Sequence, residues 1–545
     1  MTFERADGKN SSYLVPFLVL LAAYCVWVLT LPLFPSLDGS LHLYYASVLG
    51  SLLSGSKDFA SYYFIRHILP PYALHYYFLI AIAHFFGYVM ADKLLVCLIF
   101  IVTACGFRYL SLSLGPSGDL MSLFIIPLLL NWPLGMGFYN YCLAIGMALW
   151  ALGFWYRAVE HRSHRLWAAF LITVVLMVFT HPVPLLLIYA LVGLDVAWRM
   201  LKRFRGDTFS ELSARQIVHL FRFDVLYMLL AWSTVGYIAL FVSTKASNGN
   251  LIRAYPRSVE LLRLAKLSTL AMFSGFRPLV AAYRISLYLL LLLAVILACN
   301  GIVTRWRNEK NTAADLLLIC SLLLLIAIPL LPGSNYIAQR LVVVVWIGTL
   351  ASASGHTLLS ISSRRTISGI AIAYAFGFLV FANARIRPVA SQIVQIENAP
   401  LTLQRGVGFV LGLPNPPDPS DLNYIPYYWA GARYFRRTNS ILLNGGWLYQ
   451  NYLPLGSRLN QISEHLTPET QDSPGDLYQL LLHSASARKT FLPRANLLIF
   501  TGRIGTDRLS TIVKTVDDSE PTRTWTCDSR EWYSICMAPF ASPVR

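Results

Sequence analysis

The sequence predicts a polytopic α-helical membrane protein with about 11 transmembrane helices, its N-terminus inside, and a small extracytoplasmic α/β domain at its C-terminal end. Three observations predict this architecture. The chain of 545 residues is 56% hydrophobic and only 13% charged. Apolar runs of membrane-spanning length recur up to residue 384 and stop there. Basic residues cluster at alternate connections between these runs, as the positive-inside rule requires.

Twelve apolar runs divide the first part of the chain. The first run is too long for the core of a signal peptide and lacks a cleavage site of small residues, so we expect it to remain as an anchor. Residues 1–384 then form a membrane domain, and residues 385–545 form a soluble domain. The runs cover residues 13–34, 72–90, 93–114, 120–134, 138–156, 166–180, 182–200, 225–244, 285–301, 313–331, 337–361 and 367–384.

The basic clusters orient the runs. Residues 1–384 hold 28 Lys and Arg against 14 Asp and Glu, and such an excess sets membrane topology rather than nucleic-acid binding. The clusters fall on one side, the cytoplasmic one, if each later run crosses once. Counting back then puts Asp38 inside and the N-terminus outside, unless one earlier run does not cross. Run 72–90 follows Pro70-Pro71 and is rich in Tyr and His, which suits a helix lying in the membrane interface. With that run lying flat, loops 35–90 and 245–280 and the C-terminal domain are external.

The C-terminal domain carries the signals of a small α/β unit. Residues 414–419 form a Pro-rich rigid connector, and residues 495–501 predict a buried strand. Residues 525–537 predict a pair of strands around Cys527 and Cys536. These cysteines form a disulfide if the domain lies in an oxidising compartment, and two free thiols explain them equally well.

Asp38 is the first candidate for chemistry. It follows the first apolar run and is the only acid between Asp7 and Asp58. A carboxylate there serves as a general base towards an acceptor hydroxyl or amide. The alternative is an N-cap, because a helical pattern begins at Gly39 and Asp is a preferred N-cap residue. The sequence leaves both open.

Four further polar residues are candidate substrate ligands on the external side. His42, one turn after Asp38, shares an acceptor or a metal with it, or hydrogen-bonds within its own helix. His181 lies at a helix–Pro boundary and is equally explained by structure. Asn140 lines a pocket with Trp132, or Trp132 packs in the core. Arg340 binds a phosphate, or it anchors a helix at the lipid headgroups.

The loop over residues 245–279 is basic although it is expected to be external. It holds six cations against Glu260 alone, which calls for an anionic partner such as a phosphate or lipid headgroups. Arg253 and Arg257 flank Ala254-Tyr255-Pro256, where a Pro-centred turn can direct two guanidinium groups at one phosphate. Diffuse attraction to the membrane is the alternative.

The order of these features resembles the GT-C superfamily of membrane glycosyltransferases, which includes protein O-mannosyltransferases, aminoarabinose transferases and uncharacterised bacterial relatives. The resemblance covers the layout of residues 13–280. One span leads to an external loop with an acid in its first turn. An amphipathic helix, Pro70-Pro71, the aromatic stretch 72–87 and a span that ends in residues 108–110 then follow.

The resemblance implies a fold, an activity and a location. Run 72–90 corresponds to a juxtamembrane helix, Asp38 to the catalytic acid, and the basic loop to the binding site of a polyprenyl phosphate. The chain has Asp38-Gly39 where many members have an Asp/Glu pair, which leaves a divalent metal open, and residues 385–545 match nothing in the family. The implied location is a bacterial inner membrane with the C-terminal domain outside.

Two functions of different classes follow. The first is a glycosyltransferase that moves a sugar from a polyprenyl-phosphate donor to an external acceptor, with Asp38 as general base. The acceptor is a glycan, a lipid or a protein that the sequence does not name. No cofactor other than that metal is implied, and no nucleic-acid partner. The second is a non-catalytic transporter or envelope-assembly protein, which requires polar residues deep within the spans. Few are present, and this favours the enzyme.

Overall fold

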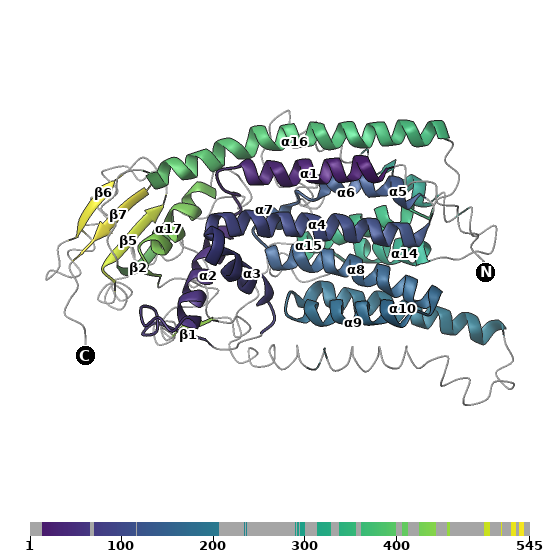
Figure 1. The fold of residues 1–545 in the computed structure, drawn as a ribbon, viewed down its shortest axis with the longest axis horizontal. Helices are drawn as coiled ribbons and strands as arrows, with labels where there is room; N and C mark the ends of the chain where they lie inside the picture. Colours follow the sequence, from purple (N-terminus) through teal and green to yellow (C-terminus); the bar gives the residue numbers. More distant parts are fainter. Residues whose placement is uncertain are drawn as a thin grey trace.

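Eight helices of the computed structural model form an elongated bundle in which they run side by side along the long axis (Figure 1). They are α1 (Leu14–Thr30), α4 (Tyr88–Leu114), α8 (Tyr139–His161), α9 (His164–Val178), α10 (Pro182–Gly206), α14 (Ala313–Ala327), α15 (Ile337–Ala353) and α16 (Ile361–Asn398). The structure describes residues 13–65, 70–115, 117–206, 292–293, 295–299, 313–328, 337–355, 361–398, 406–412, 425–442, 455–457, 495–501, 525–529 and 533–538, with a few single positions besides.

Within those ranges, five apolar helical segments are long enough to cross a membrane, one of them the interrupted segment Gly118–Gly135. The prediction of a polytopic helical membrane protein is therefore confirmed, whereas the number of spans and their orientation stay predictions. Helices α4 and α8 pack most closely because glycines face each other. A Cβ atom on Gly106 would lie 2.8 Å from the carbonyl oxygen of Gly146, so a larger residue would force the two helices apart.

The apolar run 120–134 does not form one continuous helix. It divides into α5 (Gly118–Met121), a 3-10 turn η1 (Ser122–Phe124), α6 (Ile125–Leu128) and α7 (Trp132–Gly135). Prolines contribute to the breaks, because Pro127 and Pro133 lack the backbone N–H that a helix interior requires. Asn131 then caps α7, its side chain accepting a 3.1 Å hydrogen bond from the amide of Leu134.

Helices α2 (Gly39–Leu53) and α3 (Leu74–Phe86) lie at one end of the bundle, which we call the α2 end. The first amide of α3 donates to the carbonyl of Phe179, between α9 and α10. After Gly87, with φ +77°, α4 starts at the same end, where Lys93 donates to two carbonyls at the end of α1. Both ends of α3 thus lie at the α2 end, in agreement with a segment that does not cross.

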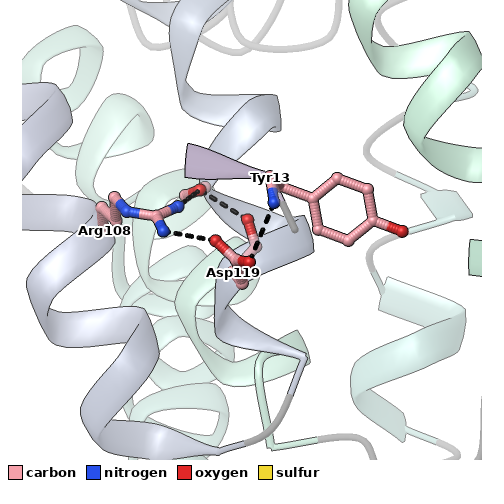
Figure 2. A network of polar contacts seen from close by, with 4 residues as sticks. Tyr13, Arg108 and Asp119 are labelled. Atoms are coloured by element: carbon pink, nitrogen blue, oxygen red, sulfur yellow. Dashed lines mark hydrogen bonds and ion pairs between the residues drawn. The ribbon is translucent and has the colours of Figure 1, made fainter. Parts of the chain in front are cut away.

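The opposite end, which we call the α5 end, holds a closed polar network (Figure 2). Arg108 of α4 forms an ion pair with Asp119 of α5 and donates to the hydroxyl of Ser122 over 2.8 Å. Asp119 also accepts a 3.1 Å hydrogen bond from the backbone amide of Tyr13, whose ring points away from the network. The network fixes the start of α1 against α4 and α5.

The C-terminal part contains a five-stranded mixed sheet in the order β3–β2–β5–β7–β6. Its strands are β2 (Val407–Gly412), β3 (Ile441–Leu442), β5 (Leu497–Thr501), β6 (Thr526–Ser529) and β7 (Tyr533–Met537), and helix α17 (Ile425–Arg437) packs against it. Strand β5 and the pair β6–β7 occur where the sequence predicts strands. Cys527 and Cys536 lie opposite each other in that pair and form a disulfide.

Two of the connections between the C-terminal part and the membrane part run through the backbone. Helix α16 runs without interruption through residue 384, so the predicted domain boundary lies inside a helix. Strand β4 (Leu455–Ser457) pairs antiparallel with β1 (Tyr63–Ile65), which lies in the connection between α2 and α3. The C-terminal part therefore contacts the α2 end, where most of the candidate site residues lie.

Candidate functional site

Asp38 occupies the N-cap position of α2, but its side chain makes no capping hydrogen bond. Its backbone amide donates to the carbonyl of Met136 over 3.1 Å, and the amide of Leu37 donates to Gly135 over 2.8 Å. Gly137 packs against this backbone with φ +83°, and a Cβ there would lie 2.9 Å from the nitrogen of Asp38. The α7–α8 connection thus holds the backbone of Asp38, and the carboxylate is left for another use.

The electrostatic environment of Asp38 suits a base. Burial raises its pKa to about 7, and the nearby Arg340 guanidinium opposes this rise. The residue as a whole is only partly buried. None of the ion pairs seen in the described ranges includes Asp38. A carboxyl group that titrates near neutral pH is well matched to general base catalysis.

Arg340, near the start of α15, is held by aromatic rings. Its guanidinium carbon lies 4.0 Å from the ring centroid of Phe138 and 5.6 Å from that of Tyr141. Tyr141 also donates its hydroxyl to the backbone carbonyl of Arg340 over 2.7 Å. The Nε atom is buried and has no hydrogen-bond partner among the described residues. This cation therefore has hydrogen-bonding capacity that an anion can fill.

His181 lies near Arg340, but one of its ring nitrogens is bonded to the start of α10. Its Nδ1 accepts a 3.1 Å hydrogen bond from the amide of Val183, in the first turn of α10. The ring is 2% exposed and packs edge-on against Tyr72 and Tyr141, with centroids 4.7 and 5.2 Å away. Burial and the charge of Arg340 lower its pKa, so the imidazole stays neutral with its proton assigned to Nε2.

His42 is occupied at both ring nitrogens. Nε2 lies 3.0 Å from the carbonyl of Gly137 and must donate to it, which leaves Nδ1 to accept from the hydroxyl of Tyr76 over 3.0 Å. The side chain is 4% exposed, and burial lowers its pKa to about 4. A neutral, fully bonded imidazole favours a structural role in the site over the ligand role that the sequence also allows.

Two tyrosines of the site were not singled out from the sequence. Tyr72 follows Pro70-Pro71 and has φ +70°, a left-handed conformation that costs a non-glycine residue roughly 1–3 kcal/mol. Burial and the charge of Asp38 raise the pKa of Tyr76, which places its hydroxyl within electrostatic reach of the carboxylate. The double proline before an aromatic run was the available signal for Tyr72, whereas nothing local marked Tyr76.

The remaining sequence candidates fall into two groups. Asn140, in the first turn of α8, accepts a 2.9 Å hydrogen bond from the next amide in the chain, and Trp132 is buried edge-on against Phe138. Trp132 thus packs in the core, and Asn140 lies at the α2 end, where its side chain is bonded to its own helix. Arg253 and Arg257 lie outside the described residues. Within the described ranges, no three His, Cys, Asp or Glu side chains gather as a metal site would require.

An apolar cavity of about 330 Å³ lies inside the bundle, between α8, α10, α14 and α15. Leucine, isoleucine, valine and alanine side chains make up most of its lining. Three of its residues lie about one helical turn beyond residues of the polar site: Ile145 follows Tyr141, Pro184 follows His181, and Val344 follows Arg340. The cavity therefore begins beneath the polar site and extends into the bundle.

Comparison with known proteins finds similarity among solved structures but not in sequence. No protein-family model matches the chain, and no curated protein matches it in sequence. It is similar to a crystal structure of ArnT from Cupriavidus metallidurans bound to undecaprenyl phosphate. The identity is 13%, the alignment covers 98% of this chain and 99% of that one, and the TM-score is 0.46. A similarity at this level supports no conclusion about the reaction. Any conclusion about the reaction depends on the residues of the site.

Proposed function

We propose that this protein is a membrane glycosyltransferase that moves a sugar from a polyprenyl-phosphate donor to an acceptor on the external face, with Asp38 as general base. One observation carries the proposal. A carboxylate that caps no helix lies within electrostatic reach of Arg340, which lies one helical turn before Val344 in the lining of an apolar cavity. A base, a cation and an apolar cavity are the three parts that a lipid-linked anionic donor requires.

Asp38 is the group that activates the acceptor. Its carboxylate takes the proton of an acceptor O–H, and the acceptor oxygen attacks the anomeric carbon of the donor sugar. The bond between that carbon and the phosphate oxygen breaks, and the phosphate leaves with the electron pair. Attack from the face opposite the leaving group inverts the anomeric configuration. The pKa of about 7 keeps a useful fraction of Asp38 ionised at neutral pH.

Arg340 is the group that receives the leaving phosphate. Charge develops on the phosphate as the sugar departs, and a fixed cation at that point stabilises the transition state more than the bound donor. The rings of Phe138 and Tyr141 hold the guanidinium in place before the donor binds. Arg253 and Arg257 are proposed as further phosphate ligands, on the sequence argument alone.

The cavity is the proposed binding site for the lipid chain of the donor. Its apolar lining matches an isoprenoid chain, and its start one turn, about 5.4 Å, beyond Arg340 separates chain and phosphate appropriately. A transporter is the alternative, and it requires a polar path through the membrane. Asp195 of α10 does not favour such a path, because it forms an ion pair with Arg199 at 3.0 Å and accepts a 2.7 Å hydrogen bond from the indole of Trp155.

The test is Asp38→Asn in membranes supplied with a panel of radiolabelled polyprenyl-phosphate sugars. The variant keeps the size of the side chain and removes the base. We expect donor turnover to fall by a factor on the order of 100 or more, with binding of polyprenyl phosphate retained. Asp58→Asn, an exposed acid in the α2–α3 connection, is the matched control and should remain active. Full activity of Asp38→Asn would remove the base and, with it, the main support for an enzyme.

A further inference from the structure

Helix α17 of the C-terminal part packs directly on the segment that carries Asp38. Trp429 is completely buried, and its indole Nε1 donates a 2.5 Å hydrogen bond to the carbonyl oxygen of Ser36. Ser36 precedes Asp38 by two residues and is itself completely buried. A residue that lies far along the chain thus satisfies a backbone acceptor next to the proposed base.

The same segment is held from a second direction. The hydroxyls of Ser36 and Tyr139 lie 2.6 Å apart. Gly39 fits between the side chains, since a Cβ there would lie 2.9 Å from the Tyr139 hydroxyl and 3.2 Å from the Trp429 ring. With the amide of Asp38 bonded to the α7–α8 connection, residues 36–39 are fixed from α8 on one side and from α17 on the other.

Helix α17 is itself anchored to the α2 end. After α17, the carbonyl of Ser440 accepts from the hydroxyl of Tyr44 over 3.0 Å, and the amide of Leu442 donates back to that hydroxyl over 3.0 Å. Tyr63 donates to the carbonyl of Leu442 over 2.6 Å. These contacts are buried and join α2 and β1 to β3, so Trp429 is held in place with respect to the Asp38 segment.

We infer that Trp429 is a positioning residue, through which the C-terminal part of the chain fixes the Asp38 segment in the geometry that catalysis needs. The inference rests on the proposed function for its consequence and on the contacts above for its geometry. A base has to be held within a fraction of an ångström of its productive position, and misplacement by about 1 Å costs on the order of 100-fold in rate. The C-terminal part is then a component of the active site.

The experiment compares Trp429→Phe with Trp525→Phe in the full-length protein. Both variants remove a buried indole from the C-terminal part, but Trp525 lies at the sheet and not at the Asp38 segment. Hydrogen exchange of the amides of Leu37 and Asp38 measures the positioning directly. We expect faster exchange in Trp429→Phe and unchanged exchange in Trp525→Phe, because only the first loses a contact to this segment.

Kinetics provide the second measurement. Trp429→Phe should lower kcat about 10- to 100-fold with little change in KM, and Trp525→Phe should lower neither. In the Asp38→Asn background, Trp429→Phe should add no further loss, because both changes act through one group. Tyr139→Phe, which loosens the same segment from α8, should also speed exchange and gives a second test if Trp429→Phe does not fold.

The outcomes separate the two proposals. Unchanged exchange at Leu37 and Asp38 in a folded Trp429→Phe variant overturns the positioning role, whatever the activity. Faster exchange together with an active Asp38→Asn variant supports the positioning role and overturns Asp38 as base. Losses in Trp429→Phe and Asp38→Asn that multiply in the double variant show that Trp429 acts by another route and also overturn the inference.

Discussion

The two ends of the helical bundle differ in whether their charged side chains form ion pairs. At the α5 end, Arg108, Asp119 and Ser122 satisfy one another, and the amide of Tyr13 completes the network (Figure 2). The charges and hydrogen-bonding groups of these residues are paired with one another. Such a network fixes helices in place and offers little to a ligand.

At the α2 end, two opposite charges lie near each other but form no ion pair. Asp38 and Arg340 interact electrostatically without forming an ion pair, and the Nε of Arg340 has no partner in the described part of the chain. Asp92 of α4 is 1% exposed, and its carboxylate lies within electrostatic reach of Tyr139 and of Arg436 on α17. A buried donor without a partner is costly, so the Nε of Arg340 beside Asp38 is the mark of a site that a substrate completes.

The sharpest test of this comparison is whether the ends face opposite sides of the membrane. Ser54→Cys places a thiol in an exposed position after α2, and Arg162→Cys places one in an exposed turn at the other end. With the exposed Cys299 replaced, a membrane-impermeant maleimide added outside should label the first variant and leave the second unlabelled. The reverse pattern would invert the predicted topology, and labelling of both would show that the ends do not mark two sides.

The next largest effect is expected from breaking the closed network. Arg108→Met leaves Asp119 largely buried without its cation, which should destabilise the protein by about 3–5 kcal/mol. The melting temperature of the purified protein in detergent measures this loss. Arg108→Met combined with Asp119→Leu should recover part of it, because no charge is then left unpaired. If the single variant melts like the wild type, the network does not stabilise this end.

The smallest expected effect is a shift in the pH dependence of activity. Catalysis by Asp38 requires the ionised carboxylate, so kcat/KM should rise with pH around a midpoint near 7. Arg340 lowers the pKa of Asp38, so Arg340→Gln should move that midpoint to higher pH. Arg387→Gln, which removes an exposed cation bonded to Thr30 and Asn383, is the control and should leave the midpoint in place. A midpoint that stays fixed or falls in Arg340→Gln would show that the two groups are not coupled.

Much of the architecture followed from local patterns in the sequence. Apolar runs identified the helices of the bundle, because a membrane-spanning segment has to bury its backbone within itself and expose apolar side chains. Charge parity and the aromatic run after Pro70-Pro71 predicted that α3 does not cross. A short apolar run located β5, and the stretch around Cys527 and Cys536 located the β6–β7 pair. Asp38 stood out because an isolated acid at the end of an apolar run has few explanations.

The tertiary structure decided how those residues are used. Whether Asp38 caps α2 depends on its side-chain direction, and His42 is occupied only because Gly137 and Tyr76 are brought to it. The neighbourhood of Asp38 and Arg340 and the packing of Trp429 on Ser36 join segments hundreds of residues apart. Periodicity, composition and capping preferences act over a few residues, so they determine elements and their order. A site made by distant segments depends on how the elements pack, which no local pattern specifies.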